Sequence, residues 1–143
     1  MNIYFACSIT GGRDFESIYQ AVIAFLLANG HEVPTAHLAD SGVKALEAVV
    51  NPREVYERDT AWIRTCDTLI AEVSTPSHGV GYEVAYALSI GKPVLCIYSE
   101  KQPISKMLTG NTHPNIRVKS YSEADEAIKI IRSFLRAQSP NRL

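Results

Sequence analysis

The sequence predicts one α/β domain, a flavodoxin-like or Rossmann-like three-layer sandwich around a five-stranded parallel sheet in the order 2-1-3-4-5. Five short apolar runs with β-branched or aromatic residues recur along the chain. Segments of helical periodicity alternate with these runs, which is typical of parallel sheets covered on both faces. The chain has 143 residues, which is the usual size of one domain.

The predicted strands are short and are bounded by polar or glycine-containing segments, as buried parallel strands usually are. They are Ile3–Cys7, His31–Ala36, Thr68–Val73, Pro93–Tyr98 and Asn115–Lys119.

The first two predicted helices show amphipathic spacing and recognisable ends. The first has Ile18, Val22 and Phe25 on one face, and Gly30 is placed to end it. The second begins at Asn51-Pro52, a capping residue followed by a favourable first helical residue. The face of this helix that is expected to meet the sheet carries Val55, Tyr56, Asp59, Trp62 and Ile63.

Two further long helices are predicted in the second half of the chain. Val80–Ile90 is stopped by Gly91, and Ser122–Arg136 opens with Ser122 and Asp125 at the spacing of a variant capping box. A turn of helix is expected near Ser105–Leu108. The least regular stretch, Leu38–Val50, is expected to be a mobile loop or a short helix.

Composition excludes several classes of protein. The chain is 46% hydrophobic and 20% charged, which excludes disorder, and its formal net charge of -1 leaves no broad basic field for a nucleic acid polymer. No apolar run approaches the roughly 18 residues of a membrane span. The three cysteines form no CxxC pair, so we expect reduced, buried thiols in a cytoplasmic protein. We expect residues 1–138 to form the domain and 139–143 a frayed tail.

The first candidate binding segment is Ser8–Arg13, directly after the first strand. In such folds ligands bind beyond the carboxyl ends of the strands. Gly11 and Gly12 allow backbone amides to approach an anion, and Arg13 could clamp a phosphate. The segment lacks both the Walker pattern and the third glycine of the dinucleotide fingerprint, so an ordinary strand-to-helix turn remains the alternative.

The second candidate is the glycine-bearing loop Ser77–Glu83, which follows the third predicted strand. Glu83 is the only acidic or basic residue between His78 and Lys92, in a helix that is otherwise apolar. A carboxylate is costly to bury unless it is paired or has a task. The alternative is a first-turn glutamate favoured by the helix dipole.

Two more residues complete the constellation. Asp59 lies on the stripe expected to face the sheet, and the alternative is an ion pair with Arg58 or Arg64. Tyr4 lies inside the first strand, where a buried hydroxyl needs a polar partner or is otherwise only core. Two inward carboxylates beside a phosphate cradle indicate glycosidic chemistry on a sugar phosphate. No histidine spacing indicates a metal site, no cofactor is implied, and GxSxG is absent.

Three segments together resemble the nucleoside 2-deoxyribosyltransferase superfamily, and within it the 2′-deoxynucleoside 5′-phosphate N-hydrolases of the Rcl type. The segments are IYFACSITGGRD, ERDTAWIRTCDTLIAEVSTPSHGVGYEVAYAL and GKPVLCIY. The resemblance runs from about Asn2 to Tyr121 and is weakest at Leu38–Val50. It implies cleavage of a 2′-deoxynucleoside 5′-monophosphate to free base and 2-deoxyribose 5-phosphate.

The resemblance also implies roles for individual residues. Glu83 matches the nucleophile that forms a covalent deoxyribosyl intermediate, Asp59 the acid that assists departure of the base, and Tyr4 the tyrosine that holds the nucleophile. His37 aligns with a histidine near the base, and Ser105 with a serine that reaches the phosphate from the partner subunit of a homodimer. The residues matching the two phosphate loops are Ser8, Ile9, Gly11, Gly12, Arg13, Ser77 and Gly79.

Three functions therefore stay open at the level of sequence. The first is a nucleotide N-hydrolase, which Ser77 and Ser105 favour as phosphate-binding serines. The second is a deoxyribosyltransferase, which would pass the sugar to a second base. The third is a non-catalytic nucleotide-binding module, which has no use for two carboxylates near an anionic ligand.

Overall fold

A four-stranded parallel sheet runs through the middle of the protein. The computed structural model describes residues 1–139. Within them the strands β1 (Ile3–Ala6), β2 (Thr68–Glu72), β3 (Val94–Ser99) and β4 (Ile116–Tyr121) lie side by side in that order. All three pairs are parallel, which confirms the predicted α/β class.

The fifth strand that the sequence predicts, His31–Ala36, is not formed. This segment pairs with the start of β1 at a single bridge, between Asn2 and Glu32. Beyond the bridge the chain turns into the 3₁₀ helix η1 (Ala36–Ala39), and the backbone N–H of Phe5 donates to the Thr35 hydroxyl at 3.0 Å. A side chain thus takes the hydrogen bond that a fifth strand would have accepted. The predicted count of five strands is wrong, whereas the four strands that form lie in the predicted relative order.

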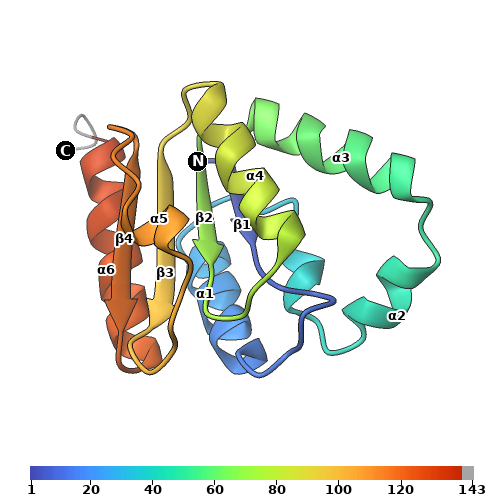
Figure 1. Cartoon of the computed structure of the whole chain (residues 1–143), viewed down its shortest axis with the longest axis horizontal. Helices are drawn as coiled ribbons and strands as arrows, with labels where there is room; N and C mark the ends of the chain where they lie inside the picture. Colours follow the sequence, from blue (N-terminus) through green and yellow to red (C-terminus); the bar gives the residue numbers. More distant parts are fainter. Residues whose placement is uncertain (140–143) are drawn as a thin grey trace.

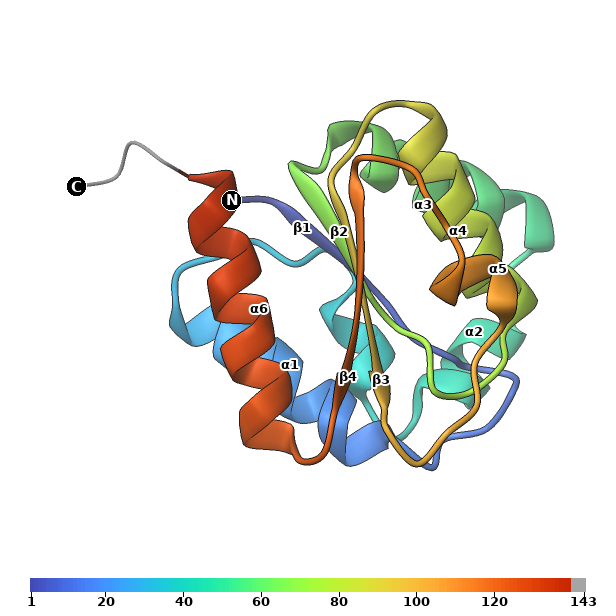
Figure 2. The same cartoon turned by 60° about the vertical axis from the view of Figure 1, so that its left-hand side comes forward.

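Helices cover both faces of the sheet and give three layers (Figures 1 and 2). The helices α1 (Glu16–Ala28) and α6 (Ala124–Gln138) lie on one face. On the other face lie α3 (Pro52–Thr65), α4 (His78–Ser89) and the short α5 (Lys106–Thr109). The stretch expected to be irregular holds η1 and the short helix α2 (Val43–Ala48), at the edge of the molecule in Figure 1.

Alternation along β1 decides which layer each of its side chains enters. Ile3 and Phe5 pack in the core under α1 and α6, whereas Tyr4 and Ala6 pack in the core under α3 and α4. All four are completely buried. Tyr4 is therefore directed toward the helix that carries Glu83.

Two predicted capping signals, at the starts of α3 and α6, can be compared with the structure. Asn51 caps α3 by accepting from the Arg53 N–H at 2.8 Å, as the sequence predicts. The predicted capping pair Ser122–Asp125 is wrong, since Glu126 accepts from both the backbone N–H and the hydroxyl of Ser122, at 2.7 and 2.6 Å. The reason is that α6 begins at Ala124, so Glu126 stands three residues after the capping position.

The C-terminal end of the described chain packs back on its beginning. Ser139 ends α6, and its hydroxyl lies 3.6 Å from the sulfur of Met1. The remainder of the predicted tail, 140–143, lies outside the described residues. In residues 1–139 no helix is long and apolar enough to cross a membrane, and all three cysteines are buried free thiols.

Candidate functional site

The loop Ser8–Arg13 touches the connection between β2 and α4 at Thr75 and Pro76, whereas Gly79 and Gly81 of the second predicted loop lie in the first turns of α4. A Cβ atom added to Gly11 would collide with the carbonyl oxygen of Pro76 and would lie 2.8 Å from the Ser8 hydroxyl. Gly12 has a φ of 123°, a conformation that side-chain-bearing residues rarely adopt. Both glycines are therefore required by the backbone, and the first loop and the β2–α4 connection form one continuous surface.

The Ser8 hydroxyl is a buried polar group without a hydrogen-bond partner among the described residues. Such groups are rare in folded proteins and indicate an unfilled role. This hydroxyl lies beside Gly11, beneath the first loop.

Arg13 holds the first loop against η1. Its guanidinium donates to the carbonyl oxygens of Ser8 (3.2 Å), Leu38 (2.8 Å) and Asp40 (3.1 Å), and its Nε lies 3.0 Å from a Glu16 carboxylate oxygen. A direct clamp on a phosphate, as the sequence suggests, would have to break one or more of these bonds. In this structure Arg13 fixes the shape of the cradle.

Glu83 and Tyr4 meet beneath the N-terminal part of α4. The Tyr4 hydroxyl donates to Glu83 Oε1 at 2.6 Å, although the residues are 79 positions apart in sequence. Desolvation raises the pKa of Glu83 to about 7, the hydrogen bond from Tyr4 opposes the rise, and the charge of Asp59 adds to it. Near neutral pH this carboxyl group therefore exchanges its proton, as a reactive carboxylate in a partly dry site would.

Asp59 brings a second carboxylate to the same place from α3. Its charge acts on both Glu83 and Tyr4, and it raises the pKa of each. The ion pair that the sequence left open is present, since Arg58 Nε lies 2.8 Å from Asp59 Oδ1. Arg64, the other candidate partner, donates to the Tyr86 hydroxyl.

The residues that α3 buries differ in part from those that the sequence predicts to face the sheet. Thr60 and Ile63 are its buried residues, whereas the Tyr56 side chain is 55% exposed and packs edge-on against the ring of Tyr82 on α4. The helix α3 thus packs along α4 rather than flat on the sheet.

Sequence reasoning missed an ionic chain that leads from Asp59 to α2. Arg58 also donates to both carboxylate oxygens of Glu47, at 3.2 and 3.3 Å, and Glu47 Oε1 lies 2.9 Å from His37 Nε2. The His37 ring is edge-on to Trp62 at 6.2 Å between centroids. Glu47 and Arg58 thus connect His37 to Asp59.

Glu72, at the end of β2, is a second carboxylate that sequence reasoning missed. It is fully buried and accepts hydrogen bonds from the hydroxyls of Ser74 and Tyr121, and burial raises its pKa. The Ser74 hydroxyl in turn accepts from the Ser99 N–H at 2.7 Å. This network joins the ends of β2, β3 and β4. The sequence signal that could have revealed it is a charged residue, Glu72, inside the apolar run 68–73.

Ser77 and Ser105 line one hollow of about 600 Å³, mostly apolar, between α4 and α5. Both serines cap helices, since Ser77 accepts from Val80 N–H and Ser105 from Met107 N–H. Gly79 lies in the first turn of α4, and a Cβ there would meet only the Ser77 hydroxyl. The structure therefore places Ser77 and Ser105 beside the same hollow, with Gly79 next to Ser77.

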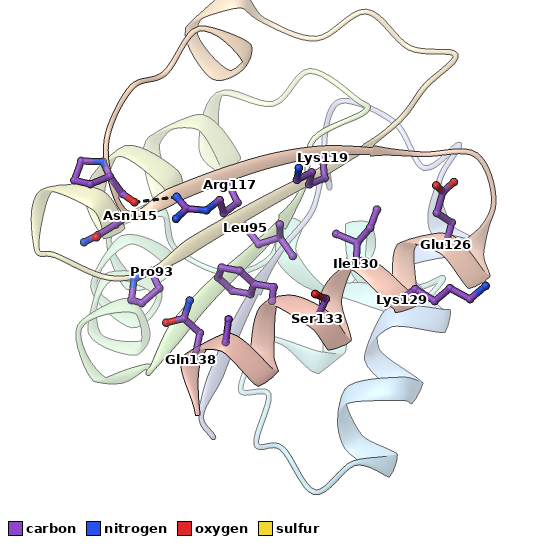
Figure 3. A pocket seen from close by; sticks show the side chains of 13 residues that line it. Pro93, Leu95, Asn115, Arg117, Lys119, Glu126, Lys129, Ile130, Ser133 and Gln138 are labelled. Carbon is purple, nitrogen blue, oxygen red and sulfur yellow. Dashed lines mark hydrogen bonds between the residues drawn. The ribbon is translucent and has the colours of Figure 1, made fainter. Parts of the chain in front are cut away.

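A separate groove of about 660 Å³ lies between β4 and α6 (Figure 3) and contains none of the predicted site residues. Arg117 and Lys119 line it from the strand, and Arg117 donates to the Pro114 carbonyl oxygen at 2.9 Å. Throughout residues 1–139 no group of three or more His, Cys, Asp or Glu side chains is arranged to hold a metal ion.

The family model described as nucleoside 2-deoxyribosyltransferase matches residues 3–128. The chain belongs to this family. One similar relative is the "Putative 2′-deoxynucleoside 5′-phosphate N-hydrolase 1" of Methanococcoides burtonii, which is 42% identical over 83% of this chain and 98% of its own. Another is the mouse 5-hydroxymethyl-dUMP N-hydrolase, which is 35% identical over 93% of this chain and 79% of its own.

The fold is shared with a solved structure of low sequence identity. The CMP N-glycosidase of Clostridium botulinum superposes with a TM-score of 0.73 over 94% of this chain and 99% of its own, at 21% identity. The match to the family model confirms the resemblance to the nucleoside 2-deoxyribosyltransferase superfamily seen in the sequence.

Proposed function

We propose that this protein is an N-glycosidase that hydrolyses 2′-deoxynucleoside 5′-monophosphates to free base and 2-deoxyribose 5-phosphate. The observation that carries the proposal is the 2.6 Å hydrogen bond between Tyr4 and Glu83, on the same edge of the sheet as the contact between Gly11 and Pro76. The relatives named N-hydrolases support the same reaction class.

Glu83 is the proposed nucleophile. Its carboxylate attacks C1′ as the N-glycosidic bond breaks, and the bond's electron pair leaves with the base. A 2-deoxyribosyl group ionises readily because no electron-withdrawing 2′-hydroxyl destabilises the developing cation. The departing base takes up a proton. Water then attacks C1′ of the ester and gives up a proton, and the C1′–O bond to Glu83 breaks. The Glu83 carboxylate is restored and 2-deoxyribose 5-phosphate is released, so that the protons balance.

The Tyr4 hydroxyl aims the nucleophile. It donates to one Glu83 oxygen and leaves the other free to face the sugar. Because Tyr4 is completely buried in the sheet, its position is fixed before substrate arrives, which reduces the reorganisation needed in the transition state. Asp59 is proposed to assist departure of the base, and His37 to lie beside the base.

The joined loops are the proposed phosphate cradle. Backbone amides at Gly11 and Gly12 and the unpaired Ser8 hydroxyl supply donors on the first loop. Ser77 and Gly79 supply the start of α4, whose N-terminal partial charge favours an anion. Anchoring the phosphate lets remote binding energy orient C1′ against Glu83.

A homodimer is part of the proposal, with Ser105 reaching the partner's phosphate and the reaction taking place in the cytoplasm. The α5 region supports the dimer, because Met107 is 82% exposed and Ser105 is exposed beside it. Tyr82 on α4, which covers the same face of the sheet as α5, is also 54% exposed and lies beside Tyr56 of α3. The three free cysteines suit a reducing compartment.

The function is tested by incubating the protein with nucleosides and their 5′-monophosphates, deoxy and ribo, and measuring release of free base. We expect deoxynucleoside monophosphates to react far faster than the matching nucleosides. Glu83→Gln should lower kcat by at least about 10³-fold while nucleotide still binds. Equal rates on nucleosides, or transfer to an added second base in preference to water, would instead support a deoxyribosyltransferase.

A further inference from the structure

The ionic chain Asp59–Arg58–Glu47–His37 connects the candidate site to α2 and η1. Asp59 and Arg58 lie on α3, Glu47 on α2, and His37 on η1. Arg58 is the central member, because it contacts a carboxylate at each end.

The Arg58 guanidinium is held on three sides. Nε binds Asp59, the two terminal nitrogens bind the two oxygens of Glu47, and the guanidinium carbon lies 5.0 Å from the centre of the Trp62 ring. Neighbouring residues on a helix point about 100° apart. Arg58 must therefore fold back to reach Asp59, and Glu47 supplies the second contact that keeps it there.

Glu47, on the short helix α2, is held by burial and by hydrogen bonds to Arg58 and His37. Its side chain is 12% exposed, although Leu46 and Val49 beside it are 58% and 84% exposed. Desolvation acts against its charge, but hydrogen bonds from Arg58 and His37 outweigh this effect and lower its pKa. The carboxylate is thus an ionic anchor that attaches α2 to α3.

We propose that Arg58 is a positioning residue, which fixes the direction and charge of Asp59 beside Glu83, and that Glu47 acts through Arg58 to hold it in place. The inference rests on the proposed function for the meaning of Asp59, and it adds two residues to the catalytic arrangement. Neither residue needs to touch the substrate.

The geometry indicates separate effects on rate and on ionisation. Losing Arg58 frees the Asp59 carboxylate to turn, and small misplacements of catalytic groups are costly to rate. Losing Arg58 also removes the cation that favours the charged form of Glu83, whose other ionisable neighbours are Tyr4 and Asp59. A residue that served only to stabilise the fold would alter neither quantity.

The test compares Arg58→Gln, Glu47→Gln and the double variant with wild type. We expect Arg58→Gln to lower kcat about 10- to 100-fold with KM changed less than about 3-fold. Glu47→Gln should lower kcat less, and the double variant should match Arg58→Gln, because Glu47 acts only through Arg58. The matched controls are Arg53→Gln and Glu57→Gln, which break an exposed ion pair of 2.7 Å on the same helix.

A second measurement needs no substrate. The side-chain carboxyl carbon of Glu83, followed by NMR against pH, should titrate at higher pH in Arg58→Gln than in wild type and stay unchanged in both controls. Unchanged kcat and titration in Arg58→Gln, or strictly additive losses in the double variant, would overturn the inference. A wild-type protein that released no base would overturn the proposed function alone, since the titration would still report on Arg58.

Discussion

At the scale of single residues, the site depends on a carboxyl group placed where water is scarce. Glu83 is half-buried in an apolar helix, and only Tyr4 donates a hydrogen bond to it among the described side chains. Its pKa of about 7, raised first by desolvation, makes both reactivity and stability sensitive to pH near neutrality.

The rate should rise with pH because attack requires the charged carboxylate. We expect kcat/KM to increase as pH passes through about 7 and to level off above it. The Tyr4 hydrogen bond favours the charged form, so Tyr4→Phe should move this limb to higher pH and lower the rate. A pH–rate profile of both proteins checks this, and an unshifted limb in Tyr4→Phe would contradict it.

Stability should change in the opposite direction. The pKa of Glu83 is higher in the folded protein than its ordinary value of 4.5, so the folded state binds this proton more tightly. The resulting stabilisation is complete below about pH 4.5 and is lost as pH rises to about 7. Glu83→Gln should therefore be more stable than wild type at pH 8 and lose this advantage at pH 4. Urea unfolding at the two pH values measures it, and an equal difference at both would argue against a strained carboxylate.

At the scale of elements, the contact between the two loops determines the shape of the cradle. A methyl group on Gly11 would have no room against the Pro76 carbonyl oxygen. Neither the Gly11 Cα nor this oxygen can move far, because both belong to the backbone. The loop must therefore shift if Gly11 is replaced.

Gly11→Ala should raise KM for a nucleoside monophosphate by about 10-fold or more, with a smaller effect on kcat, because the amides move away from the phosphate. Gly42→Ala is the control, since a Cβ there meets nothing within 4 Å. Steady-state kinetics separate the two. A Gly11→Ala enzyme with normal KM would remove the first loop from phosphate binding.

Local signals predicted most elements, whereas tertiary contacts explain the errors. Asn51 and Pro52 define the start of α3 by their own chemistry. The strand predicted at 31–36 is absent because the Thr35 hydroxyl accepts the hydrogen bond from the Phe5 N–H. This contact spans 30 residues, and no local pattern reveals it. The carboxylates Glu83 and Asp59 were recognisable because charge is unusual in apolar stripes. The Glu47–Arg58 contact was not, because it depends on how α2 lies against α3.

At the scale of the whole molecule, the exposed apolar surface of α4 and α5 favours a second copy of the chain. If each site takes Glu83 from one subunit and Ser105 from the other, mixing Glu83→Gln with Ser105→Ala protein after subunit exchange should restore activity. A mixed dimer then has one site with both defects and one with neither. Analytical ultracentrifugation with the assay checks this, and a fully active monomer would contradict it.

The contact of Gly11 with Pro76 also limits how this site can diverge. The two loops come from segments more than 60 residues apart in the sequence, yet each is shaped against the backbone of the other. A change in one must be met by a change in the other, so they are expected to vary as a pair among descendants of a common ancestor. Transplanting a new specificity into this scaffold therefore requires both loops as a single cassette, because either one alone would meet a partner of the wrong shape.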